Sequence, residues 1–172
     1  MPKIVIQAIS PTMNILPVES YTLHLSLSPS KVHQILSEQC EAPRIRFGFS
    51  RNHPPFQGTC SETEFQFSRI IHYRNSFLPI IRGKIQETDI GSMIHIQMSP
   101  HPFVMVFTML WCLGWFSFIF VFLLSGSFPM QGLFFFIGLP MIVFGAFFLA
   151  FKFEVKKARA ILNQLLSNYR IE

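Results

Sequence analysis

The sequence has few charged residues, and one long stretch of it has none. Charged residues make up 13% of the 172 residues, against about 25% in a typical soluble domain. No Asp, Glu, Lys or Arg occurs between Ile90 and Phe151, so the net charge of +5 belongs to the two polar ends of the chain. This distribution argues against an ordinary soluble domain and predicts a membrane element between polar parts.

Sequence patterns that would indicate chemistry are also absent. The three cysteines form no CxxC pair, and the six histidines show no HxxxH spacing, which argues against a disulfide framework, a zinc site and a haem site. There is no GxSxG, Walker or Rossmann glycine pattern. The basic residues are thinly spread without an aromatic-basic motif, which argues against nucleic acid. We therefore expect no enzyme activity, no metal and no cofactor.

Two uncharged runs, 102–124 and 133–151, are each long enough to cross a bilayer. As helices they measure about 34 and about 28 Å, against a hydrocarbon core of about 30 Å. The connector 125–132 contains Ser, Gly and Pro and is too short to hold a domain. We therefore predict a transmembrane hairpin over 101–151. The alternative is the buried core of a soluble protein.

The charge distribution also predicts the orientation of this hairpin. A basic cluster follows the second run, and the connector has no charge; the cluster comprises Lys152, Lys156, Lys157 and Arg159. The positive-inside rule then places both termini in the cytoplasm, in a bacterial inner or thylakoid-type membrane. The same cluster would lie at the membrane surface and attract anionic lipid headgroups.

Small residues in the second run indicate a close helix contact. Gly138 and Gly145 are seven residues apart and share one helical face, which allows another backbone to approach closely in lipid. One interpretation is a homo-oligomer contact. The other is packing between the two helices of the hairpin itself, which we favour.

The polar part before the hairpin has the pattern of an α+β domain. Residues 1–20 contain three prolines and predict an extended arm, and 21–100 predict a cytoplasmic domain. The alternation in 21–27 predicts a strand, and Ser28-Pro29 predicts the start of a short helix over 29–40. Further strands, joined by short turns that indicate an antiparallel meander, are expected over 44–49, 56–61, 64–73, 78–87 and 93–98.

The last segment, 152–172, repeats apolar residues at helical spacing. It predicts an amphipathic helix that either covers the sheet or lies along the membrane. The order of strand, helix, antiparallel strands and final helix resembles a helix-grip domain with a hairpin inserted before its last helix. This is a similarity of element order only and carries no function by itself.

One polar segment is the candidate for function: Arg69, His72, Tyr73, Arg74 and Asn75. Strand alternation places Arg69 on the apolar face of its strand, where a guanidinium needs a partner. Glu62, Glu64, Glu87 and the tyrosines are the local candidates. The segment is then either a partner-binding turn or polar pocket, or a hairpin whose polar groups bond to the backbone.

The stretch Tyr73–Pro79, the following strand with Gly83, and His101–Phe103 carry a resemblance. They are similar to a group of uncharacterised bacterial, including cyanobacterial-type, two-span membrane proteins with a YRNSFLP-type segment and an HPF entry into the first span. The resemblance covers roughly residues 56–111. It implies the two-span architecture and implies no activity.

These observations favour a non-enzymatic, membrane-anchored interaction or accessory module. Its expected partners are the lipid bilayer and another membrane protein. The alternative is a lipid- or hydrophobic-ligand-binding domain of helix-grip type, tethered to the membrane. An enzyme that uses the Arg/His/Tyr segment is a third hypothesis.

Overall fold

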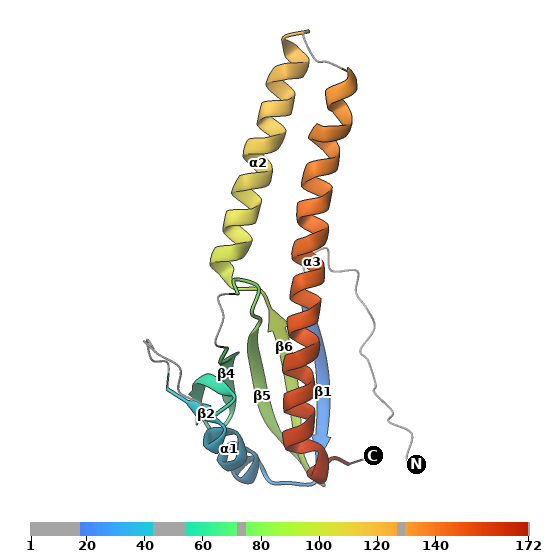
Figure 1. The fold of residues 1–172 in the computed structure, drawn as a ribbon. Coiled ribbons are helices and arrows are strands. Elements are labelled where there is room, and N and C mark those ends of the chain that lie inside the picture. The colour runs from blue at the N-terminus through green and yellow to red at the C-terminus, as the bar shows by residue number, and fades with distance from the viewer. Residues whose placement is uncertain (1–17, 43–53, 72–74, 127–129, 172) are drawn as a thin grey trace.

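A computed structural model describes residues 18–42, 54–71, 75–126 and 130–171 (Figure 1). These residues form a six-stranded sheet, a short helix and two long helices that project from one end of the sheet. The predicted α+β class is therefore confirmed. Residues 1–17 of the predicted arm over 1–20, and all of the predicted strand over 44–49, lie outside the described residues. The end of the predicted arm is not extended coil, because β1 already begins at Glu19.

The sheet is mixed, not purely antiparallel. Its strand order is β1-β6-β5-β4-β3-β2. The bounds are Glu19–Leu25 (β1), Cys40–Glu41 (β2), Phe56–Cys60 (β3), Glu64–Arg69 (β4), Ile80–Thr88 (β5) and Gly91–Ser99 (β6). The predicted antiparallel meander holds for β3 to β6, and β1 pairs antiparallel with β6. The short strand β2 is parallel to β3, which the meander did not anticipate.

The helix α1 (Pro29–Glu38) explains this topology, because it carries the chain from β1 at one edge of the sheet to β2 at the other. Ser28 is its N-cap residue and Pro29 its first residue, as predicted. Pro fits there because the first turn of a helix needs no intrahelical N–H donor. Val32 and Leu36 point into the core, one turn apart.

One face of the sheet is apolar and fully covered. Alternating side chains on β1, β4, β5 and β6, and Phe56 of β3, point to this face, as the period of two in a strand requires. These side chains pack against α1 and against the C-terminal half of α3. The sheet residues in this core are Tyr21, Leu23, Leu25, Phe56, Phe65, Phe67, Ile81, Ile85, Ile94, Ile96 and Met98. The space between the sheet and these two helices is therefore filled by side chains.

Gly83 in β5 is needed for this packing. Its cross-strand neighbour is Phe65, whose ring stacks on Phe67 at a centroid distance of 4.6 Å. A Cβ at position 83 would lie 2.0 Å from Cζ of Phe65. The ring of Phe65 thus occupies the space that any other side chain would need, and it covers the backbone of the adjacent strand.

The two long helices are α2 (Pro102–Leu124) and α3 (Met130–Leu166), followed by a 3-10 turn over Ser167–Tyr169. The predicted second span and the predicted C-terminal amphipathic helix form one helix of 37 residues. Its second half lies on the apolar face of the sheet (Figure 1), with Phe151, Val155, Ala158, Leu162 and Leu166 in the core. Of the two expected placements for residues 152–166, the structure shows the one that covers the sheet.

The first half of α3 and all of α2, which we call the apolar hairpin (residues 102–124 and 130–150), are not part of this core. Both helices are long and apolar enough to cross a membrane. Their most apolar 18-residue windows are 0% and 17% buried, whereas the core helix of a soluble domain would be mostly buried. The alternative that these runs form a soluble core is therefore not supported by the fold.

Candidate functional site

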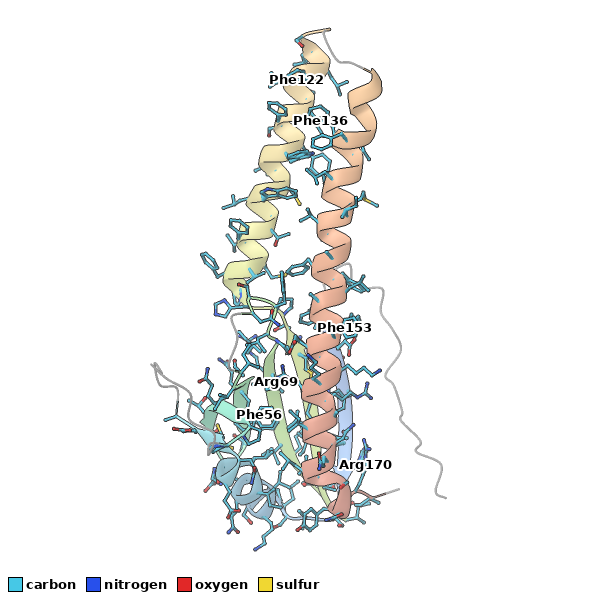
Figure 2. The ribbon with its side chains drawn as sticks, in the orientation of Figure 1. Phe56, Arg69, Phe122, Phe136, Phe153 and Arg170 are labelled. Carbon is cyan, nitrogen blue, oxygen red and sulfur yellow. The ribbon has the colours of Figure 1, made fainter. Side chains whose placement is uncertain are left out.

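A buried ion pair lies where the sheet meets the apolar hairpin. Arg69, the last residue of β4, contacts Glu154 of α3 through Nη2 and Oε2. The side chains are only 11% and 5% exposed, and Figure 2 shows Arg69 pointing toward α3. Lys157 Nζ lies 3.2 Å from the other oxygen of Glu154. The carboxylate therefore bridges two cations and ties the sheet to the helix.

The sequence predicted that a carboxylate or carbonyl groups would hold Arg69, and the structure shows a carboxylate. That carboxylate is none of the three local acids named as candidates, because it lies 85 residues further along the chain. Glu64 instead pairs with Lys84, 3.5 Å away and mostly exposed. The sequence did contain an indication that Glu154 faces the sheet. It is the single acid within the basic cluster, and helical spacing places it near Phe151 and Ala158, which face the sheet.

The basic cluster after the second span does not form a single patch. Lys152 pairs with Glu19 at the start of β1, and the guanidinium of Arg159 stacks on the ring of Tyr21, 4.6 Å from its centroid. Lys157 contacts Glu154, as described above, and Lys156 is exposed. Two of the four cations, Lys152 and Arg159, thus bind side chains of β1, whereas Lys157 contacts Glu154 of its own helix. The helix is held to β1 on one side and, through the Arg69–Glu154 pair, to β4 on the other.

The candidate interaction segment is described only at its two ends, because residues 72–74 lie outside the described residues. Asn75 Oδ1 accepts a hydrogen bond from the backbone N–H of Phe77 at 2.9 Å, which forms a tight turn. The ring of Phe77 packs edge-on against Phe147 of α3, with centroids 5.3 Å apart. Arg69 and Phe77 therefore both anchor the segment to α3. A binding role for His72, Tyr73 and Arg74 stays a prediction.

Among the residues that the structure describes, no group of three or more His, Cys, Asp or Glu side chains could hold a metal ion. Burial raises the pKa of the Cys40 thiol to about 11 and raises that of Cys60. Both thiols are therefore protonated at neutral pH, and the thiol is a poor nucleophile. Burial also raises the pKa of Tyr21 to about 12, although the guanidinium of Arg159 opposes this shift.

The face of the sheet opposite α1 and α3 is polar and has a shallow pocket of about 390 Å³. Four polar residues of the neighbouring strands β5 and β6 line this pocket: Arg82, Lys84, His95 and Gln97. Arg82 Nε donates to Gln66 Oε1 at 3.2 Å, so the face already carries an ordered row of polar side chains. We call this surface the open face.

A second cavity, of about 680 Å³ and mostly apolar, lies between α2 and α3. It begins beside Phe77 and Phe147 and reaches Trp111 and Cys112. Beyond it the helices come together, because Trp115 Nε1 donates to the backbone oxygen of Phe136 at 2.7 Å. Figure 2 shows Phe122 and Phe136 in this upper contact, with ring centroids 6.2 Å apart. We call this cavity the interhelical cleft.

Gly138 and Gly145 do not pack inside the hairpin. A Cβ built on either residue meets no described atom within 4 Å. The helical spacing explains this, since Gly145 lies roughly opposite Phe147, which faces the cleft. The preferred expectation of packing within the hairpin is therefore wrong. A homo-oligomer contact through these glycines stays a prediction.

The chain matches no family model, no curated protein and no solved structure. The resemblance to two-span bacterial membrane proteins accordingly stays a prediction, and function must be argued from the residues alone.

The ion pair at the junction gives a test of what holds the sheet to α3. Arg69→Ala should lower the free energy of unfolding by about 3–5 kcal/mol. The substitution removes the buried guanidinium that compensates the charge of the Glu154 carboxylate, while the carboxylate itself stays buried. The double variant Arg69→Met with Glu154→Leu should recover most of this loss, since apolar side chains can replace a buried pair. Denaturant unfolding of the detergent-solubilised protein measures both.

The exposed pair of Glu64 and Lys84 is the matched control on the same sheet. Lys84→Ala should change the free energy of unfolding by less than about 1 kcal/mol, because solvent screens this pair. Equal losses for Arg69→Ala and Lys84→Ala would show that the buried pair does not hold α3 to the sheet.

Proposed function

We propose that this chain is a membrane-anchored interaction module, with two membrane-spanning helices and an extramembrane sheet that binds a neighbouring membrane protein. The observation that carries the proposal is the continuity of α3, whose first half is apolar and exposed and whose second half is a core element of the sheet domain. Whatever the sheet binds is thereby coupled to the hairpin without a flexible linker.

The exposure of the hairpin supports membrane insertion. Apolar surface in water costs about 25 cal/mol per Å², and here it covers two helices of sufficient length to span a bilayer. Several large apolar side chains of α2 are at least 60% exposed, among them Phe103, Phe107, Met109 and Leu110. A hydrocarbon environment removes this cost, and it requires the helical backbone that both segments have.

The architecture favours binding over ligand storage inside the domain. A helix-grip domain would hold a ligand between its sheet and its last helix, but side chains fill that space here. The open face, by contrast, carries Arg82, Lys84, His95 and Gln97, and no helix in the described part of the chain covers it. Its strands run along the direction of the long helices (Figure 1), so the open face points sideways. A partner anchored in the same membrane would meet it directly.

The charges of the open face indicate the kind of partner. Arg82 and Lys84 outnumber the one nearby acid, Glu64, and hydrogen-bonding side chains surround them. An acidic, hydrogen-bonding extramembrane surface of a neighbouring membrane protein is complementary to this face.

The positive-inside rule supports an orientation with the sheet and both termini in the cytoplasm. The basic residues that the structure describes lie in the sheet domain and in α3, on the side of the hairpin opposite the uncharged connector. A bacterial inner or thylakoid-type membrane remains the proposed location.

Membrane extraction tests the anchoring. After a carbonate wash the chain should remain in the membrane pellet. Salt and high pH weaken only electrostatic attachment, and two apolar helices of this length are held by the hydrocarbon core instead. As a control, a protein bound only peripherally to the same membranes should be released by the same wash. Full-length protein in the supernatant would refute the membrane proposal.

Cysteine labelling tests the orientation. In a background without native cysteines, Ser127→Cys in the connector should react with an impermeant maleimide in intact cells. Ser167→Cys at the end of α3 should react only after the cells are opened. The opposite pattern would show that the sheet faces the outside.

Site-specific photocrosslinking tests the binding surface. A photoreactive phenylalanine analogue at Gln97 on the open face should crosslink to a membrane protein, and high salt should weaken this, since the proposed contact is charged. The same analogue at Gln164, exposed on α3 away from the open face, is the control. Crosslinking from Gln164 but not from Gln97 would place the partner elsewhere, and none from either site would refute the interaction role.

A further inference from the structure

We propose that the interhelical cleft binds an acyl chain of a membrane lipid from the leaflet nearest the sheet. This inference rests on membrane insertion, the first part of the proposed function, and adds a ligand site to it. The cleft is distinct from the open face and from the candidate segment, although Phe77 beside that segment lines its lower end.

The chemistry of the cleft selects an uncharged, apolar ligand. Aromatic and aliphatic side chains line nearly all of it, including Phe107, Trp111 and Phe144. Thr108 is polar, but its hydroxyl donates to the backbone oxygen of Val104 at 2.8 Å and is thereby satisfied within α2. No charged residue occurs from Ile90 to Phe151. An ionised or strongly polar ligand would find no partner here.

The two ends of the cleft limit its length. Below, Phe77 packs on Phe147 and separates the cleft from the sheet core. Above, Trp115 is bonded to the backbone of Phe136, which draws the helices together. Along α2 the lining runs from Phe103 to Cys112, nine residue steps or about 14 Å of helix.

This length distinguishes between the apolar occupants that a membrane offers. A spanning helix from a second copy or another protein needs about 30 Å, so it cannot lie along a cleft that is closed at both ends after half that distance. One leaflet has about half the hydrocarbon thickness, or about 15 Å. A flexible acyl chain of a single leaflet therefore fits the cleft, and a helix does not.

The position of the cleft makes a lipid the natural occupant. Its walls continue into the exposed apolar surfaces of α2 and α3, so it opens toward the same hydrocarbon that would surround the hairpin. An empty apolar space of this size forfeits many packing contacts. A lipid chain restores these contacts without any polar group of the protein having to move.

Photolabelling tests the proposal. The full-length protein is reconstituted into phosphatidylcholine vesicles that contain a phosphatidylcholine with a diazirine in one acyl chain, and it is irradiated, digested and mapped by mass spectrometry. We expect adducts to concentrate on cleft residues such as Phe107, Trp111 and Phe144. Adducts spread evenly over the exposed faces of α2 and α3 would show only general lipid contact and overturn the proposal.

A matched pair of variants localises the effect. Ala146→Phe fills the cleft, which Ala146 lines, and should reduce cleft adducts about tenfold, because the added ring competes for the same volume. Met141→Phe, five residues from Ala146 and therefore on the far side of α3, is already 70% exposed, so it should leave the adducts unchanged. If Ala146→Phe does not fold, the adduct map of the unaltered chain still decides.

The outcomes separate this inference from the proposed function. Protein that does not enter vesicles contradicts membrane anchoring itself. Protein that inserts but gives no preferred cleft adducts, or equal adducts in both variants, overturns only the lipid site. A crosslink between two copies through Ala146→Cys would assign the cleft to a second chain and overturn it as well.

Discussion

The contact between the second half of α3 and the apolar face of the sheet determines the rest of the structure. It buries Phe151, Val155, Ala158 and Leu162 in the core. The Arg69–Glu154 pair and the Arg159–Tyr21 stacking then fix the helix against the strands. Since α3 is one helix from Met130 to Leu166, fixing its lower half also fixes the direction of its apolar upper half.

The first long helix, α2, is also attached to the sheet by a very short connection. Only Pro100 and His101 separate β6 from α2, and the His101 ring accepts a hydrogen bond from the Phe103 N–H at the helix start. The two helices thus leave the sheet from separate positions and come together again around Trp115, Phe122 and Phe136. The interhelical cleft is the space that this arrangement leaves between them, so it follows from how the sheet is attached.

Much of the fold could be predicted where it depends on short periodicities. The alternation of Leu23 and Leu25 predicted β1, and Ser28-Pro29 predicted the start of α1, because both signals are local. The parallel pairing of β2 could not be predicted, since two residues are too short to show a pattern. The single helix α3 was divided at Phe151 because the change in composition there was interpreted as a change in structure.

The candidate site shows the same limit. The sequence indicated that Arg69 needs a polar partner, but only the fold brings Glu154 to it across 85 residues. The cleft depends on the angle between α2 and α3, and the sequence of one helix alone does not determine that angle. Glycine spacing likewise indicated a close contact, yet the rotation of α3 turns Gly138 and Gly145 away from α2.

The central claim is that α3 joins the hairpin and the sheet as one rigid body. Pulsed electron paramagnetic resonance can measure the distance between two spin labels, one at Met141 on the exposed upper half of α3 and one at Gln97 on the open face. The labelled protein is placed in nanodiscs and carries no native cysteines. We predict a single narrow distance distribution, because no flexible segment separates the two positions. A broad distribution, or two populations, would show that the helix bends near Phe151 and that the sheet moves independently of the hairpin.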